Sequence, residues 1–207
     1  MGTKDKLFKT GTRRRLSQLI GLVAVVLALT TRSTWLTGGW PSLVLAWVGL
    51  LLVAAGVFGR LLATLFIGGH KSSEIVTQGP YGLTRNPLYF FSFVGMIGLG
   101  LASANPAVLA LLVLAFGLYY PGVFAEEEAK LRRKHGGPFE TYQQRVPRFW
   151  PSLGQPWQEP DWVETSPAQF RSALGDAFGF VAAYVTLRAI AEAHARGWLP
   201  AYPLPCC

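Results

Sequence analysis

The stretch "NPLYFFSFVGMIGLGLASANPAVLALLVLAFGLYYPGVFAEEEAK", residues 86–130, decides the fold. It contains two apolar segments, at about 88–103 and 106–124, which are joined by the turn-forming sequence Ser-Ala-Asn-Pro. Each segment approaches the roughly 20 residues that a helix needs to cross the ~30 Å hydrocarbon core of a bilayer. The stretch therefore predicts a helical hairpin that crosses a membrane and returns.

The rest of the chain extends this pattern. Of its 207 residues 51% are hydrophobic and 14% are charged, and the mean hydropathy is +0.31, which is too apolar for an ordinary soluble domain. Further apolar segments lie at about 16–36, from Pro41 to 67, and at 172–191. The last contains Asp176 and Arg188, so it either spans the membrane or lies along its surface as an amphipathic helix. We expect an all-α, polytopic membrane helix bundle with about five transmembrane helices.

The basic residues indicate the orientation. They are Lys4, Lys6, Lys9, Arg13, Arg14 and Arg15 before the first segment, Lys71 and Arg85 between the second and third, and Lys130, Arg132, Arg133, Lys134, Arg145 and Arg148 after the fourth. The opposite side carries only Arg32. By the positive-inside rule, the N-terminus and residues 68–87 and 125–170 are cytoplasmic, in an inner (cytoplasmic) membrane protein. Basic clusters beside apolar segments suit this role, so we expect no nucleic-acid partner despite the net charge of +8.

The hairpin brings polar residues together. From Tyr89 to Glu127 is 38 residues, enough for one helix out, the turn and one helix back at ~1.5 Å rise per residue. Arg85, Asn86, Tyr89, Glu127 and Glu128 should therefore meet at one membrane face. This convergence predicts a pocket on the cytoplasmic side.

Helical spacing separates the three consecutive glutamates. Glu126 faces Lys130 one turn later, as on a solvated surface, whereas Glu127 and Glu128 fall on a stripe with apolar neighbours. Ionisable residues in such surroundings are candidates for a functional site. The alternative is that Glu127 and Glu128 pair with Lys130 and Arg132 on a surface helix.

Simpler structural roles exist for the residues of the hairpin mouth. Asn86 and Pro87 form a helix start, with asparagine as the cap and proline in the first turn. Arg85 alone would be a membrane-surface anchor. Arg60, near the end of the second segment, either snorkels to the interface or reaches the pocket. Cys206 and Cys207 are adjacent at the end, which excludes a disulfide framework or a metal site of spaced ligands, and we expect no metal.

Two motifs add a resemblance. The stretches "EIVTQGPYGLTRNPLY" (74–89) and "EEEAKLRRKHGGPFETYQQRVPRFWP" (126–151) resemble paired motifs of integral-membrane methyltransferases related to isoprenylcysteine carboxyl methyltransferase and phospholipid N-methyltransferases. The resemblance covers about residues 60–151. The matching positions are Val76, Thr77, Gly79, Tyr81, Arg85, Pro87, Tyr89, Glu127, Glu128, Leu131, Gly136, Tyr142, Arg145 and Pro147. Asn86 and Ser73 stand where histidine is found in other members.

The resemblance implies S-adenosyl-L-methionine as the methyl donor, bound in the cytoplasmic pocket. The implied catalytic residues are Arg85, Asn86 and Glu127, and the implied cofactor-binding residues are Tyr81, Arg85, Pro87, Tyr89, Glu127, Glu128, Tyr142 and Arg145. Arg85 or Arg145 would hold the donor's carboxylate, and Glu127 or Glu128 its ammonium or ribose hydroxyls. The aromatic residues among them, with Phe139, would line the adenine.

This reading divides the chain into a basic cytoplasmic N-terminus (1–15), two transmembrane helices (16–67), a catalytic core with the hairpin and a cytoplasmic segment (68–170), and a C-terminal helix and tail (171–207). The expected partners are membrane lipid and a lipophilic or small methyl acceptor. The possible acceptor groups are a carboxylate, a thiol and a lipid amine. The first two are favoured because they are ionised in solution or easily deprotonated, and no dedicated base is evident. The sequence does not indicate an oligomeric state. Two other functions stay open: a sterol-type reductase that uses NADPH, and a non-catalytic lipid-binding protein.

Overall fold

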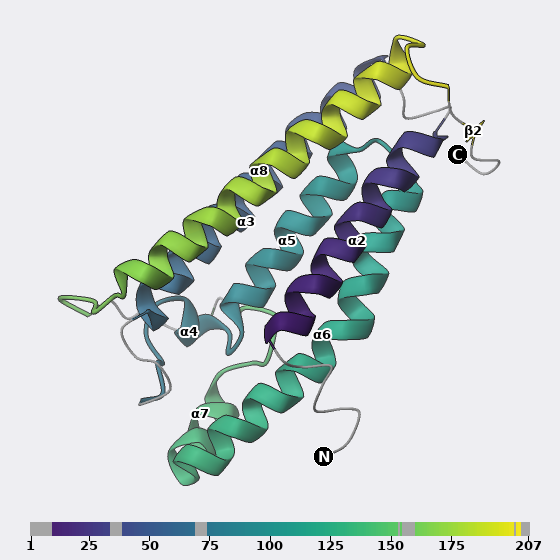
Figure 1. Ribbon diagram of the computed structural model, residues 1–207. Helices are drawn as coiled ribbons and strands as arrows, with labels where there is room; N and C mark the ends of the chain where they lie inside the picture. The colour runs from purple at the N-terminus through teal and green to yellow at the C-terminus, as the bar shows by residue number, and fades with distance from the viewer. Residues whose placement is uncertain are drawn as a thin grey trace. The chain divides into compact units, whose positions relative to one another are not determined.

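The computed structural model describes residues 10–33, 39–68, 74–152, 154, 160–200 and 202–203, with side chains from Arg15 onward. The basic residues at 4–9, His70, Lys71, Ser73 and both cysteines lie outside the described residues. The helices of the described part, drawn in Figure 1, are α2 (Thr10–Thr30), α3 (Gly39–Ile67), α4 (Pro80–Leu83), α5 (Pro87–Ala102), α6 (Pro106–His135), α7 (Gly137–Arg145) and α8 (Pro167–Ala195). Two short strands, β1 (Thr31–Arg32) and β2 (Tyr202–Pro203), pair in parallel. The prediction of an all-α bundle is confirmed.

Three of these helices are long and apolar enough to cross a membrane. They are α3, α6 and α8, whose most apolar 18-residue stretches have mean hydropathies of 2.3, 2.1 and 1.4. The segment at 172–191 is therefore part of a helix that is able to span. The apolar part of α2, Arg15–Thr30, and α5 are shorter. With 16 residues, α5 rises about 24 Å, less than the ~30 Å of hydrocarbon.

The first apolar segment ends as a helix earlier than predicted, at Thr30 instead of residue 36. The hydroxyl of Thr30 donates to the carbonyl of Val26 at 2.9 Å, and that of Thr31 donates to the carbonyl of Leu27 at 2.7 Å. These bonds satisfy carbonyls that the last turn of a helix leaves without an N–H partner. Residues 34–36 lie outside the described part.

The two helices of the hairpin both begin with an Asn-Pro pair, but the asparagines act differently. Asn105 caps α6, because its Oδ1 accepts from the main-chain N–H groups of Ala107 and Val108 at 3.0 and 3.4 Å. The side-chain amide of Asn86 instead donates to the carbonyl of Arg148. Pro87 starts α5 as predicted, whereas the side chain of Asn86 serves the site described below.

The chain divides into two compact units. Unit 1 comprises residues 1–53, 96–123 and 182–207, and unit 2 comprises residues 54–95 and 124–181. Every residue predicted for the functional site falls in unit 2. In unit 1, the turn between α5 and α6 is tied to the end of α2, since Asn105 Nδ2 donates to the carbonyl of Thr31 at 3.0 Å.

Unit 2 contains a close approach of α3 and α5. A Cβ added at Gly56 would lie 2.7 Å from the carbonyl oxygen of Phe91 and 2.8 Å from the Cα of Gly95. Only a residue without a side chain fits there. At the other end of the unit, α7 folds back beside the end of α6 (Figure 1). Phe139, Tyr142 and Val146 are buried there in a cluster against Leu131 and Ile75.

Candidate functional site

A hydrogen bond joins α5 to α6 at the predicted point of convergence. The hydroxyl of Tyr89 donates to Oε1 of Glu127 at 2.7 Å, and the ring of Tyr89 lies against that of Phe124, with 5.3 Å between centroids. Glu127 therefore has a fixed direction. In the alternative, Glu127 and Glu128 pair with Lys130 and Arg132 on a surface helix. The structure instead pairs Lys130 with Glu126 at 2.7 Å and Arg132 with Gln143, and Glu128 lies beside Arg85 and Arg148.

Glu128 lies between two arginines. Its Oε1 is 3.1 Å from Nη1 of Arg85, and Nε of Arg148 is 3.1 Å from both carboxylate oxygens. Nη2 of Arg148 also donates to Oε2. The side chains of Arg85 and Glu128 are 13% and 9% exposed, whereas that of Arg148 is 48% exposed. The hydrogen bonds from Arg148 to Glu128 raise the pKa of Arg148, so its guanidinium stays charged.

The segment before α5 is bonded to the segment after α7. The main-chain N–H of Arg85 donates to the carbonyl of Pro147 at 2.9 Å, and Nδ2 of Asn86 donates to the carbonyl of Arg148 at 2.9 Å. The hydroxyl of Thr84 donates to the carbonyl of Phe149 at 3.0 Å. These bonds fix the main chain from which both arginines project. Asn86, which is buried, is therefore a positioning residue for Arg148.

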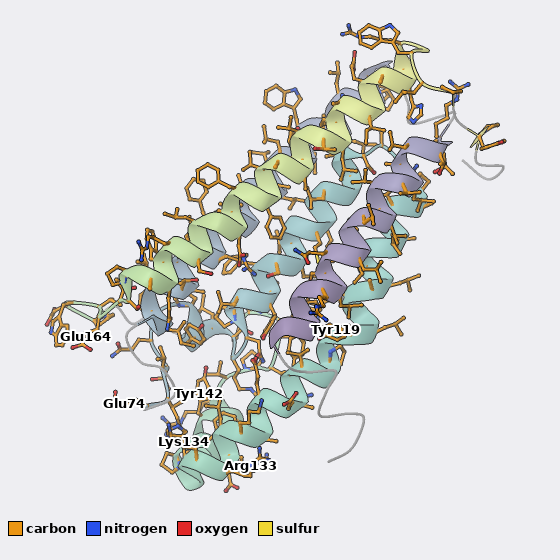
Figure 2. All side chains as sticks on the ribbon, in the orientation of Figure 1. Glu74, Tyr119, Arg133, Lys134, Tyr142 and Glu164 are labelled. Carbon is orange, nitrogen blue, oxygen red and sulfur yellow. The ribbon has the colours of Figure 1, made fainter. Side chains whose placement is uncertain are left out.

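Two buried tyrosines lie beside this cluster. The hydroxyl of Tyr142 on α7 donates to the carbonyl of Tyr81 at 2.7 Å. Burial raises the pKa of both phenols, and for Tyr81 the neighbouring Tyr142, Glu127 and Tyr89 add to the rise. The hydroxyl of Tyr81 has no hydrogen-bond partner within the described ranges, although the residue is only 6% exposed. Figure 2 shows Tyr142 on α7, near the end of α6 that carries Arg133 and Lys134.

An aromatic cluster packs behind Tyr89. Phe149 is at its centre: its ring stacks on Phe124 at 5.6 Å between centroids and meets Phe90 and Phe93 edge to face at 5.8 Å. Trp150 adds a further edge contact to Phe149 at 5.3 Å. The cluster holds residues 149–150 against α5 and α6, and so supports the position of Arg148.

Two predicted residues differ sharply in exposure. Arg145 is exposed in the last turn of α7, and the arginine that pairs with Glu128 is Arg148. Sequence reasoning chose Arg145 from the motif, and the two differ by three residues in a stretch that leaves the helix. Phe139, considered for the adenine, is 1% exposed and belongs to the core.

Arg60 forms a second polar cluster in unit 2. Its Nη2 donates to Oδ2 of Asp176 on α8 at 2.7 Å, and its Nη1 donates to the hydroxyl of Ser92 on α5. The guanidinium also lies over the ring of Phe180, 5.9 Å from the centroid. Arg60 thus joins three helices of unit 2, and the structure records no contact from it to Glu127 or Glu128 among the described residues.

A hollow of about 150 Å³ lies in the same unit. Its lining includes Glu74, Gln78, Trp162 and Phe66, and Phe66 packs against Tyr81. Trp162 presents an exposed indole at this hollow, which is the kind of surface on which a flat ring stacks. Within the described ranges, no group of three or more His, Cys, Asp or Glu residues is placed to hold a metal ion.

Comparisons with known proteins identify the family and similar chains. The family model for phospholipid methyltransferases matches residues 42–137, which include Arg85, Tyr89, Glu127 and Glu128. The nickel-cobalt-cadmium resistance protein NccN of Alcaligenes xylosoxydans xylosoxydans is 37% identical over 195 residues, covering 93% of this chain and 90% of the relative. The cobalt-zinc-cadmium resistance protein CzcN of Cupriavidus metallidurans is 35% identical over 192 residues, covering 92% and 88%. No solved structure matches the chain.

The predicted family resemblance is thus confirmed. A bundle with three helices able to cross a membrane, together with the family match, makes the chain an integral membrane protein. It belongs to the phospholipid methyltransferase family of membrane methyltransferases.

Proposed function

We propose that the protein transfers a methyl group from S-adenosyl-L-methionine, and that the donor's amino-acid end binds at Arg85 and Glu128. That end carries a carboxylate and an ammonium on the same carbon atom, so its binding site needs a cation and an anion side by side. Arg85 and Glu128 form such a pair, 3.1 Å apart and largely buried. This pair is the observation that carries the proposal.

Orphaned buried donors support the same site. Nε of Arg85 and the hydroxyl of Tyr81 find no hydrogen-bond partner in the part of the chain that the structure describes. A buried donor without an acceptor costs about 1–3 kcal/mol. A carboxylate bound at this point accepts from both residues and removes that cost. The residues present therefore fit the acidic end of the donor.

The other residues receive supporting roles. Glu127, directed by Tyr89, is placed to accept from the ribose hydroxyls, and Tyr142 holds the main chain of Tyr81. Asn86 and Pro87 set the start of α5 and the place of Arg148. The adenosine end has a candidate position in the hollow beside Trp162. Arg145 remains a proposed cofactor contact on the family resemblance alone.

S-adenosyl-L-methionine supplies an electrophilic methyl group on its sulfonium sulfur. The task of the protein is to align the acceptor with that methyl group and to exclude water. We propose a lipophilic or small acceptor, with a carboxylate or thiol preferred and a lipid amine next, because the cluster contains no residue assigned as a dedicated base. A cytoplasmic active site in the inner membrane remains our interpretation of the basic residues.

The two relatives suggest the physiological setting. Both are called resistance proteins for cobalt, cadmium and a further metal, and both align over about nine tenths of this chain. We propose that methyl transfer by this protein contributes to metal tolerance. A host that lacks the gene should grow less well in cobalt or cadmium and should recover with the wild-type gene but not with Glu128→Gln.

Donor binding is the direct test. Purified full-length protein in detergent is titrated separately with S-adenosyl-L-methionine and with NADPH. Saturation by S-adenosyl-L-methionine but not by NADPH is expected, and Arg85→Gln and Glu128→Gln should each weaken donor binding at least tenfold. Arg132→Gln is the control, because Arg132 is exposed and donates to Gln143. Binding of NADPH alone would favour the reductase. If neither compound binds, the non-catalytic lipid-binding protein is favoured. Membranes incubated with labelled donor then reveal the acceptor class by extraction.

A further inference from the structure

The carboxylate of Glu128 is fully occupied by the protein's own cations. Arg148 approaches both oxygens with its Nε at 3.1 Å and bonds Oε2 with Nη2, while Arg85 lies 3.1 Å from Oε1. A ligand ammonium therefore meets a carboxylate that already has two guanidinium partners. One of them has to yield before Glu128 can accept from the ligand.

The two arginines differ in their freedom to move. Arg85 is 13% exposed, and a departure from Glu128 would leave its charge buried without a partner. Arg148 is 48% exposed, so its guanidinium can turn outward and keep its charge in water. Its main chain is held independently, because its carbonyl accepts from Nδ2 of Asn86 at 2.9 Å and from the hydroxyl of Thr84 at 3.3 Å. The side chain of Arg148 can thus leave while the loop stays in place.

We propose that Arg148 is the resident counter-ion of Glu128, displaced by the ammonium of an amino-acid-bearing nucleoside and restored when that ligand leaves. The inference rests on the proposed function and deepens it. Arg85 approaches Oε1 only, so Oε2 of this buried carboxylate needs a second cation whether or not the ligand is present. Arg148 supplies that cation in the free state. The exchange replaces the hydrogen bonds and ionic contact of Arg148 with Glu128, and no covalent bond changes.

The inference makes Arg148 a positioning residue that competes with the ligand. Its removal should therefore tighten binding, whereas the removal of a residue that touches the ligand should weaken it. The difference should depend on the amino-acid end, which bears the ammonium. S-adenosyl-L-methionine and S-adenosylhomocysteine both carry this end, and 5′-methylthioadenosine lacks it.

The experiment titrates these three compounds into purified wild-type protein, Arg148→Gln and Arg132→Gln. Arg148→Gln should bind the two ammonium-bearing compounds about tenfold more tightly, which corresponds to about 1.4 kcal/mol of competition removed, and should bind 5′-methylthioadenosine as the wild type does. Arg132→Gln should match the wild type throughout, because Arg132 is an exposed arginine that bonds Gln143. Arg148→Lys, which keeps the charge but loses the planar fork, should fall between the two.

A second readout does not depend on affinity. Phenylglyoxal modifies free guanidinium groups, and mass spectrometry locates the modified arginines. S-adenosylhomocysteine should increase the labelling of Arg148 and leave that of Arg132 unchanged, whereas 5′-methylthioadenosine should change neither.

The outcomes separate the two proposals. If the wild type binds none of the three compounds, the proposed function itself fails. If the wild type binds the donor but Arg148→Gln binds it equally or more weakly at an unchanged melting temperature, only the displacement of Arg148 is overturned. Protection of Arg148 from phenylglyoxal by S-adenosylhomocysteine overturns it as well.

Discussion

Tyr89 on α5 and Glu127 on α6 are 38 residues apart in the chain, and the hydroxyl of the first donates to the carboxylate of the second at 2.7 Å. The neighbouring Glu128 turns to Arg85 and Arg148 instead. Two consecutive carboxylates thus have different partners, one a neutral donor and the other a pair of cations. We expect them to recognise different parts of a ligand.

The first prediction concerns the hydroxyl of Tyr89. Tyr89→Phe removes its bond to Glu127 and keeps the ring contact with Phe124. A hydrogen bond to a charged group contributes about 1.5–3 kcal/mol, so donor binding should weaken roughly tenfold as Glu127 loses its direction. Isothermal titration with S-adenosyl-L-methionine measures the effect. Tyr184→Phe is the matched control, since it loses a bond to the carbonyl of Ala46 in unit 1 and should leave donor affinity unchanged.

The second prediction concerns Asn86. Asn86→Ala removes the bond to the carbonyl of Arg148 and should lower the free energy of unfolding by about 1 kcal/mol. Donor affinity should change as well, because the position of Arg148 depends on this bond. Asn86→His, which introduces the family's commoner residue, can donate to the same carbonyl and should recover part of the stability.

Asn105→Ala provides the control for this pair. It removes the cap of α6 and should cost about 1 kcal/mol without any effect on donor affinity. Thermal unfolding measures the stability of Asn86→Ala, Asn86→His and Asn105→Ala, and titration measures their affinity for the donor. Equal affinities in Asn86→Ala and the wild type would remove Asn86 from the site.

The third prediction is a dependence of stability on alkaline pH. Burial raises the pKa of Tyr81 and Tyr142 above the ordinary value near 10. Above about pH 10 the unfolded chain loses these protons while the folded chain keeps them, so the folded state binds more protons and the free energy of unfolding falls as pH rises. Below that pH the contribution is constant.

Melting temperatures between pH 7 and pH 11 test this directly. Tyr142→Phe should be less stable at neutral pH, since it loses the bond to the carbonyl of Tyr81, but its melting temperature should fall less steeply above pH 10. Thr141→Ala, on the same helix, removes no titrating group and should keep the wild-type slope. Parallel slopes for Tyr142→Phe and the wild type would contradict the assignment.

The fourth prediction concerns the approach of α3 and α5. Gly56→Ala places a Cβ within 2.7 Å of the carbonyl oxygen of Phe91, which is main chain and cannot rotate away. The helices must separate, at a cost of about 1–3 kcal/mol. Gly175→Ala on α8 meets nothing within 4 Å and should change stability by less than about 1 kcal/mol. Thermal unfolding in detergent compares the two, and an equal loss would contradict the close packing.

Much of the fold follows from local signals in the sequence. The Asn-Pro pairs place the starts of α5 and α6, and the spacing of Glu126 from Lys130 correctly separates it from Glu127 and Glu128. The end of α2 was placed too late, because the apolar composition continues past Thr30 while threonine hydroxyls and strand pairing end the helix. Hydropathy reports what enters a membrane and does not report where the helical hydrogen bonds stop.

The cluster around Glu128 was predictable only in part. The sequence predicts that Arg85 and Glu128 lie at the same membrane face, because helix geometry fixes both ends of the hairpin, and the structure places them 3.1 Å apart. Arg148 was missed as the second partner because it follows the end of α7 at Arg145, where no periodicity indicates the direction of a side chain. Its direction comes from Asn86 and Thr84, more than 60 residues earlier, through contacts that only the folded chain reveals.

The bonds between residues 83–86 and 147–152 can form only after the later of these two stretches has been synthesised. Leu83 accepts from the N–H of Ser152, and Arg85 donates to Pro147, so the two stretches complete each other. α6 ends at His135, before residue 147 has been made. A nascent chain that ends there contains Arg85 and Glu128 but lacks Arg148, so the contacts of Glu128 with Arg148 form only after the later residues have been added.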